Sequence, residues 1–151
     1  FAMLPFCGYN MADYWSHWLE MKRLVKHEPK IFRVNWFRKD EQGHFMWPGY
    51  GDNMRVIEWI VNRVHSRVGA QEGPLGLTPY YEDLDLEGLN YSRDDFNALM
   101  AVDTDEAQKD VEEQKKYFRP FSDEQRLPKE FVAEISLLSL RLERADDVWM
   151  P

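Results

Sequence analysis

One short stretch of the sequence gathers aromatic and amide side chains that could bind a flat ligand. The residues are Trp36, Phe37, Phe45, Trp47, Tyr50 and Asn53. Stacking of a base on an aromatic ring contributes about 1 to 3 kcal/mol and tolerates any base. An amide side chain carries both donors and an acceptor, so it can pair with a base edge and discriminate between bases. The combination predicts a slot for a purine.

The same aromatic residues could instead belong to the hydrophobic core. Most aromatic side chains in proteins serve packing, so aromatic content alone does not separate the two interpretations. Gly49 and Gly51 lie within the stretch, and glycine allows the backbone to approach a ligand closely. They favour the binding interpretation.

The first half of the chain predicts a helix, a strand, a loop and a second helix around this stretch. Asn10 is suited to cap a helix over about residues 11–26, whose apolar residues recur every three or four positions. Residues 31–37 are rich in branched and aromatic side chains, which favours a largely buried strand. Glycine and proline favour an irregular loop over residues 44–53. Residues 54–67 predict a helix that is apolar over much of its circumference and therefore sits deep.

The second half of the chain predicts an irregular piece followed by three helices. Glycine and proline return over residues 69–90, where alternating leucines favour a short extended segment. Ser92 and Asp95 resemble a capping box. Further helices are expected from about residue 103 to 118 and from Pro128 to 144. The fold class is therefore α+β and helix-rich, with the aromatic stretch in residues 1–68 and the acidic helices in residues 69–151.

Length and composition indicate a water-soluble chain. Its 151 residues and 18.1 kDa fit one domain, and 44% of the residues are hydrophobic without a run long enough to span a membrane. The single cysteine, Cys7, can form no internal disulfide, which favours a reducing compartment and makes the cytoplasm our expectation. The chain begins at Phe1 rather than at methionine, so organelle targeting stays open.

The charge distribution argues against a nucleic-acid partner. The net charge is −8, and residues 1–68 carry 10 Lys and Arg against 7 Asp and Glu, whereas the remainder carries 9 against 20. A protein that tracks phosphates along a nucleic acid needs a basic field.

Motifs for phosphate transfer or metal binding are not evident in the sequence. No lysine follows a glycine, so there is no phosphate-cradling Gly-Lys-Ser/Thr loop. The four histidines are not spaced as a metal triad. The acidic residues between 83 and 94 imitate a calcium loop, but leucines at the second and fourth places and prolines upstream favour an ordinary acidic turn.

Three segments carry a resemblance to a known family. They are Pro5-Phe-Cys-Gly-Tyr-Asn10, Ile31-Phe-Arg-Val-Asn-Trp-Phe-Arg-Lys-Asp40 and Phe45-Met-Trp-Pro-Gly-Tyr-Gly-Asp-Asn53. They resemble the C-terminal part of GTP-dependent phosphoenolpyruvate carboxykinases. The resemblance covers residues 1–68 and continues more weakly through Gly76–Pro79, Asp83–Leu89 and the closing helices.

The resemblance implies a function for the aromatic stretch. Enzymes of that family are carboxy-lyases that convert oxaloacetate and GTP to phosphoenolpyruvate, carbon dioxide and GDP, using Mn²⁺ and Mg²⁺, in gluconeogenesis and related pathways. By the resemblance this chain is the C-terminal portion of the nucleotide-binding domain. Its guanine-binding residues are expected to be Phe37, Phe45, Tyr50, Gly51, Asp52 and Asn53, with Trp36 and Trp47 flanking the pocket.

Two positions depart from the family pattern. The family commonly has phenylalanine where this chain has Tyr50, and glutamate where it has Asp52. A tyrosine ring keeps its stacking face, so neither change is expected to abolish base binding.

The resemblance also implies what the chain does not supply. The family's metal ligands, phosphate loop and mobile lid precede the position of Phe1. We therefore expect no catalytic or metal-binding residue here, no activity from the chain alone, and a missing N-terminal part of the same enzyme as its partner, with the intact enzyme a monomer that contacts neither nucleic acid nor membrane.

Two other hypotheses remain open at the level of sequence. One is a free-standing module that holds a purine or nucleic-acid base between aromatic rings. The other is a structural helical interaction module, which would bind no ligand. The acidic second half disfavours a nucleic-acid track, but it does not exclude a module that binds a single base.

Overall fold

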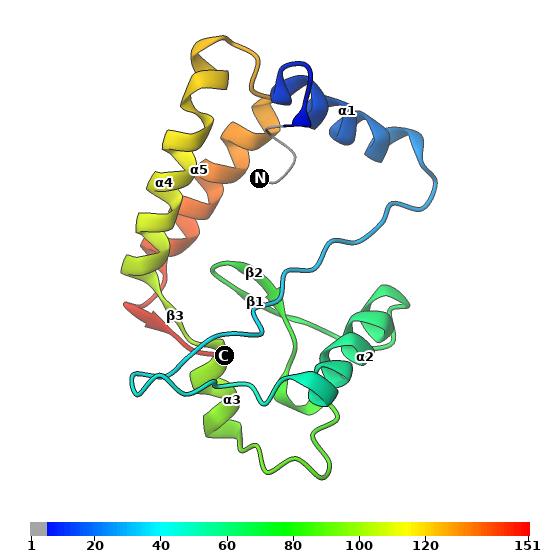
Figure 1. Ribbon diagram of the computed structural model, residues 1–151, viewed down its shortest axis with the longest axis vertical. Coiled ribbons are helices and arrows are strands. Elements are labelled where there is room, and N and C mark those ends of the chain that lie inside the picture. Colours follow the sequence, from blue (N-terminus) through cyan, green and yellow to red (C-terminus); the bar gives the residue numbers. More distant parts are fainter. Residues whose placement is uncertain (1–5) are drawn as a thin grey trace. The chain divides into compact units, whose positions relative to one another are not determined.

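The computed structural model describes residues 6–151, so Pro5 of the first family-like segment lies outside the described residues. The chain forms two compact units. The first unit comprises the chain up to Pro29 together with Asp105–Arg144, and the second comprises Lys30–Thr104 together with Ala145–Pro151. Helices dominate and the sheets are small (Figure 1), which agrees with the expected helix-rich α+β class. Residue 68, the limit that we drew between two segments of one partial domain, lies inside the second unit.

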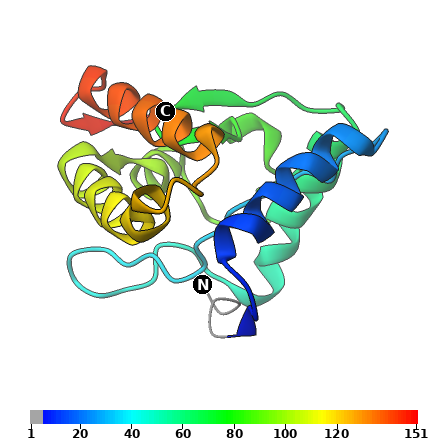
Figure 2. The same ribbon diagram turned by 90° about the horizontal axis from the view of Figure 1, so that it is seen from above.

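Three helices build the first unit. They are α1 (Met11–Leu24), α4 (Thr104–Asp123, whose first residue falls in the second unit) and α5 (Lys129–Arg144). The side-chain oxygen of Asn10 accepts a hydrogen bond from the backbone nitrogen of Ala12 at 2.9 Å, which confirms the predicted cap. Helices α4 and α5 lie alongside each other, as Figure 2 shows from above. The last helix begins directly after Pro128, as predicted.

An aromatic cluster around Trp15 holds these three helices together. The indole ring stacks on Phe131 of α5 with ring centroids 5.2 Å apart. It also meets Phe118 and Phe121 of α4 edge to face, at 5.2 and 4.9 Å. Ion pairs between Arg23 and Glu130 and between Arg126 and Asp13 lie outside the cluster. Because exposed ion pairs contribute little, the aromatic contacts carry most of the stability of this unit.

Replacing Trp15 by alanine is expected to destabilise the first unit by about 3 kcal/mol, because truncating an aromatic side chain among packed rings removes contacts and leaves a cavity. Trp18 on the same helix is the matched control, since it is 55% exposed and its ring contacts are with its helical neighbours Tyr14 and His17. Trp18→Ala should cost less than about 1 kcal/mol. Urea denaturation followed by circular dichroism measures both changes, and equal losses would contradict this assignment.

The second unit consists of short elements around a small core. Two helices, α2 (Asn53–Val64) and α3 (Arg93–Met100), are its largest elements. Two antiparallel pairs accompany them: β1 (Gln71–Gly73) with β2 (Gly76–Thr78), and β3 (Val102–Asp103) with β4 (Val148–Trp149). Short 3-10 turns, η2 (Tyr50–Asp52) and η3 (Tyr81–Asp83), complete it.

The core of the second unit forms around Trp59, Leu84 and Phe96. Ser92 and Asp95 form the predicted capping box, in which each side chain accepts a hydrogen bond from the other residue's backbone nitrogen. The residues after Asp83 form turns rather than the expected extended segment, and Leu84 is buried in the core. No described helix is long and apolar enough to cross a membrane.

The predicted strand over residues 31–37 is wrong. No strand among the described residues pairs with residues 31–37, and Ile31 is 94% exposed. The backbone nitrogen of Phe37 donates to the side-chain oxygen of Asn35 at 3.0 Å instead of to a neighbouring strand. Branched and aromatic residues favour strands because they pack on a half-buried pleated surface. Because no described strand lies beside residues 31–37, their preference for a packed sheet surface cannot be met.

The prediction that the helix after residue 53 sits deep is also wrong for the described chain. Only Trp59 of α2 is buried. Ile57, Val61 and Val64 are 41%, 45% and 49% exposed. The helix is therefore apolar on a face that no other described element covers.

Candidate base-binding site

A tight turn over residues 38–46 brings two phenylalanine rings together. The carboxylate of Asp40 accepts hydrogen bonds from the backbone nitrogens of Gln42 and His44, at 2.9 and 2.8 Å. These bonds to the charged form, led by that of His44, lower the pKa of Asp40. An isolated antiparallel bridge between Lys39 and Phe45 closes the turn. Phe37 and Phe45 thereby meet on one side of it.

The two rings are available to a ligand rather than buried. Their centroids lie 6.2 Å apart with the planes at 61°. Phe37 is 73% exposed and Phe45 is 57% exposed. The ammonium of Lys39 lies 4.9 Å from the centre of the Phe45 ring. An exposed apolar patch can mark a ligand site or a surface that another part of the protein covers.

The loop after Pro48 holds Tyr50 in an uncommon conformation. Gly49 has φ 77°, which favours glycine, and Tyr50 itself has φ 47°, in the left-handed region that bulky residues seldom adopt. Its side chain is 99% exposed. Non-glycine residues with a left-handed backbone are found more often at ligand sites than elsewhere, so the conformation of Tyr50 favours a role in binding.

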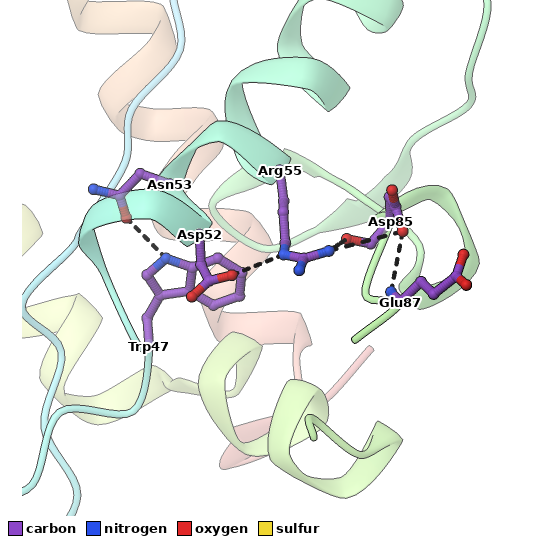
Figure 3. Close-up of polar contacts among 6 residues, drawn as sticks. All are labelled: Trp47, Asp52, Asn53, Arg55, Asp85 and Glu87. Atoms are coloured by element: carbon purple, nitrogen blue, oxygen red, sulfur yellow. Dashed lines mark hydrogen bonds and ion pairs between the residues drawn. The ribbon is translucent and has the colours of Figure 1, made fainter. Parts of the chain in front are cut away.

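Trp47 and Asn53 join the loop to the start of α2. The indole nitrogen of Trp47 donates to the side-chain oxygen of Asn53 at 2.9 Å, as Figure 3 shows. Trp47 is only 3% exposed, and its ring packs edge to face against Tyr91 at 5.6 Å. Asn53 is half-buried at the first position of the helix.

Arg55 fixes the residues beside Asn53. Its Nε donates to the carboxylate of Asp52 at 2.9 Å, and its Nη1 donates to the backbone oxygen of Asp85 at 2.6 Å (Figure 3). The carboxylate of Asp85 in turn accepts from the backbone nitrogen of Glu87 at 3.0 Å. The acidic turn that imitates a calcium loop in the sequence therefore serves here to anchor the arginine.

The structure brings the predicted site residues together in two groups. Phe37 and Phe45 form one ring pair, and Trp47, Asp52 and Asn53 form a network around the start of α2. Tyr50 and Gly51 lie in η2, between Trp47 and Asn53 in the chain. The described residues show no ring contact from Tyr50 or Trp36 to the phenylalanine pair. Both groups belong to the second unit.

Sequence reasoning missed Arg55, Tyr91 and Arg38 as supporting residues. The spacing of Asp52 and Arg55, three residues apart near a helix start, was a usable signal for an ion pair. Nothing in the sequence places Tyr91 against Trp47. Nor does it indicate that Arg38 donates to the backbone oxygens of Leu99 and Ala101, at 2.5 and 2.8 Å.

Metal-binding geometry is not found in the described residues. No group of three or more His, Cys, Asp or Glu side chains among residues 6–151 could hold a metal ion. A cavity of about 720 Å³ opens in the first unit, lined mainly by Leu19, Phe118, Phe131 and Ile135 with charged residues at its edge. None of its lining residues belongs to the candidate base-binding site.

Replacing Phe37 by alanine in the intact protein is expected to raise the KM for the nucleotide about ten-fold, because one stacking surface is lost. Trp36→Ala is the matched control, since Trp36 is half-buried whereas Phe37 is 73% exposed. It should act on stability and leave KM nearly unchanged. Steady-state kinetics and a melting curve for each variant separate the two effects. A larger KM change for Trp36→Ala would show that Trp36 is the stacking ring.

Comparison with known proteins identifies relatives of a much greater length. The sequence profile described as "Phosphoenolpyruvate carboxykinase C-terminal P-loop domain" matches residues 1–141. The chain is 44% identical over 147 residues to "Phosphoenolpyruvate carboxykinase [GTP]" of Anaeromyxobacter sp. strain K, covering 97% of this chain and 24% of the relative. It is 45% identical over 148 residues to the protein of that name from Neocallimastix frontalis, covering 96% of this chain and 24% of the relative. It thus spans about a quarter of the length of these relatives.

Proposed function

The chain belongs to the family of GTP-dependent phosphoenolpyruvate carboxykinases, and from that premise we propose that residues 37–53 form the guanine-binding part of such an enzyme. The observation that carries the proposal is the ring pair of Phe37 and Phe45, whose centroids lie 6.2 Å apart, together with the exposure of Phe37, Phe45 and Tyr50 at 73%, 57% and 99% in this chain. Large aromatic rings held at the surface are suited to stack on a flat ligand.

Each proposed residue has a distinct task. Phe37 and Phe45 stack on the purine, and Tyr50 covers it from the loop, since its ring is free of intramolecular contacts that would bury it. Asn53 pairs with the base edge and distinguishes guanine from adenine. Gly51 and Asp52 shape the loop, with Asp52 held by Arg55 at 2.9 Å. Trp47 flanks the pocket and holds Asn53 through its indole N–H, and Trp36 flanks the pocket as well.

The reaction belongs to the intact protein. We assign to it the conversion of oxaloacetate and GTP to phosphoenolpyruvate, carbon dioxide and GDP, as the names of the relatives and the family resemblance suggest. No residue of this chain is assigned to catalysis. The described residues offer no fitting ligand set for Mn²⁺ or Mg²⁺, so the ligands of both ions are assigned to the remainder of the enzyme.

The remainder of the same enzyme is the proposed partner of this chain. The exposed apolar residues Ile31 and Val34 and the apolar face of α2 give it a surface to cover. Burying them would remove an aggregation hazard and would also give residues 31–37 the neighbour that a strand needs. We further propose a cytoplasmic, monomeric intact enzyme, to which the free thiol of Cys7 is suited.

A comparison of nucleotides tests the proposed function. The intact protein is assayed for phosphoenolpyruvate formation from oxaloacetate with GTP, ITP and ATP as phosphoryl donors. GTP and ITP, whose bases share a 6-oxo group, should support turnover, and ATP should support much less. Equal turnover with ATP and GTP would overturn the proposed role of residues 37–53. The alternative of a free-standing base-binding module is not supported by the relatives, which are about four times as long.

A further inference from the structure

We propose that Trp47 sets the purine specificity of the site by fixing the orientation of the Asn53 side-chain amide. The inference rests on the proposed function, because it names the group that makes the base-reading residue selective. Trp47 is a positioning residue here. It acts on the base through Asn53 rather than by touching the base itself.

The hydrogen bond between the two side chains can form in only one sense. The indole nitrogen is a donor and has no acceptor capacity, so the atom of Asn53 that faces it must be the carbonyl oxygen. The distance from Trp47 Nε1 to Asn53 Oδ1 is 2.9 Å. The amide nitrogen of Asn53 consequently points away from the indole, as Figure 3 shows.

The indole is held too firmly to follow a rotation of the amide. It is 3% exposed, and Tyr91 packs against it edge to face. The hydroxyl of Tyr91 donates to the backbone oxygen of Met46 at 2.8 Å, directly beside Trp47 in the chain. Burial raises the pKa of Tyr91 to about 12, so this hydroxyl stays protonated and able to donate near neutral pH.

The backbone of Asn53 is held as well. Its backbone nitrogen donates to the backbone oxygens of Tyr50 and Gly51, and α2 starts at this residue. Both partners of the Trp47–Asn53 bond therefore have restricted positions. The amide can turn over only by breaking that bond.

A fixed amide nitrogen presents donors to the ligand. Guanine and hypoxanthine carry an oxygen at position 6, which accepts a hydrogen bond, whereas adenine carries an amino group, which would oppose one donor with another. Without the indole the amide could rotate by half a turn and offer its oxygen to the 6-amino group of adenine. The bond from Trp47 thus occupies the amide oxygen of Asn53 and leaves only the amide nitrogen, a donor, to face the base. Adenine, which presents its own amino donor, is then disfavoured.

A double-mutant cycle on the intact protein tests this inference. The readout is the ratio of the Kd for ADP to the Kd for GDP, measured by calorimetry on the unmutated protein and on Trp47→Phe, Asn53→Ala and the double variant. Trp47→Phe should lower the ratio about five-fold, in line with the loss of one hydrogen bond. In the Asn53→Ala background the same change should have no further effect, because the two residues act as one unit.

Trp59→Phe is the matched control. Trp59 lies on α2, is 5% exposed and has an indole nitrogen without a hydrogen-bond partner in the described chain. It therefore loses packing but no bond to Asn53, and the ratio should stay unchanged even if the protein melts at a lower temperature. A ratio of Kd values is insensitive to the fraction of folded protein, so destabilisation alone does not imitate the expected result.

Three outcomes overturn the inference. An unchanged ratio in Trp47→Phe, with preference for GDP intact in the unmutated protein, would reject the role of Trp47 and leave the proposed guanine site standing. Equal Kd values for GDP and ADP in the unmutated protein would reject both. An additive loss in the double variant would show that Trp47 acts without Asn53. If Trp47→Phe fails to fold, 3-benzothienylalanine at position 47 keeps the ring shape without the N–H and must give the same loss.

Discussion

Replacing Asn53 by alanine in the intact protein is expected to reduce the preference for GTP over ATP, measured as the ratio of kcat/KM values, by about ten- to a hundred-fold. That range corresponds to about 1 to 3 kcal/mol, the cost when a site built to hydrogen-bond a ligand loses its partner or meets the wrong one. Only the discrimination should change strongly. Stacking on Phe37 and Phe45 does not depend on base identity, so ATP turnover should fall little or rise.

Asn62→Ala provides the matched control for this experiment. Asn62 lies on the same helix, α2, and its side chain is 3.5 Å from Arg67 rather than near Trp47. Its removal should leave the nucleotide preference as it is. If both asparagine variants lost the preference equally, the effect would come from the helix as a whole and not from base reading at position 53.

The chain purified alone is expected to show no decarboxylation of oxaloacetate and no phosphate exchange between GTP and phosphoenolpyruvate. Phosphoryl transfer depends on cations and donors positioned around the transferring group, and the proposed site offers stacking and one amide. GDP and guanosine should bind it with similar affinity, roughly millimolar or about 4 kcal/mol, because much of the affinity for a phosphorylated nucleotide comes from charge-assisted contacts.

Calorimetry on the isolated chain measures this second prediction. Adenosine is the control ligand, and it should bind no more tightly than guanosine. Micromolar, magnesium-dependent binding of GTP would contradict the account, since it would place a phosphate site within residues 1–151. A circular dichroism spectrum with helical content is required before the titration, to show that the chain is folded.

The starts of the helices were predictable because their signals are local, whereas α4 continues to Asp123, past the expected end at about residue 118. The cap of α1 is Asn10, and the capping box of α3 involves residues three apart, so neither depends on distant parts of the chain. Pro128 likewise marks the start of α5 by its own missing N–H. These features could be located within a residue or two without a structure.

Non-local features were not predictable in the same way. Residues 31–37 have the composition of a strand, but a strand requires hydrogen bonds from a neighbour, and the sequence of the segment does not say whether one is present. Similarly, the apolar face of α2 predicts burial only if another surface lies against it. Ile57 and Val61 remain exposed because no described part of the chain supplies that surface.

For the candidate site, residue types were readable and their orientation was not. The aromatic residues and Asn53 stand out by composition, and the family resemblance points to the same positions. The direction of the Asn53 amide depends on Trp47, whose own position depends on Tyr91, 44 residues further along the chain. The anchoring of Arg55 by Asp85 is similarly remote in sequence. The proposed specificity therefore rests on contacts that only the folded chain shows.

The central claim, that residues 37–53 hold a guanine base, is tested most directly by a crystal structure of the intact protein with GDP. The account predicts the base against the rings of Phe37 and Phe45, with the side-chain nitrogen of Asn53 about 3 Å from the guanine O6 and its oxygen still accepting from Trp47. A base bound away from residues 37–53, or stacked on Trp36 with Phe37 turned into the core, would contradict it.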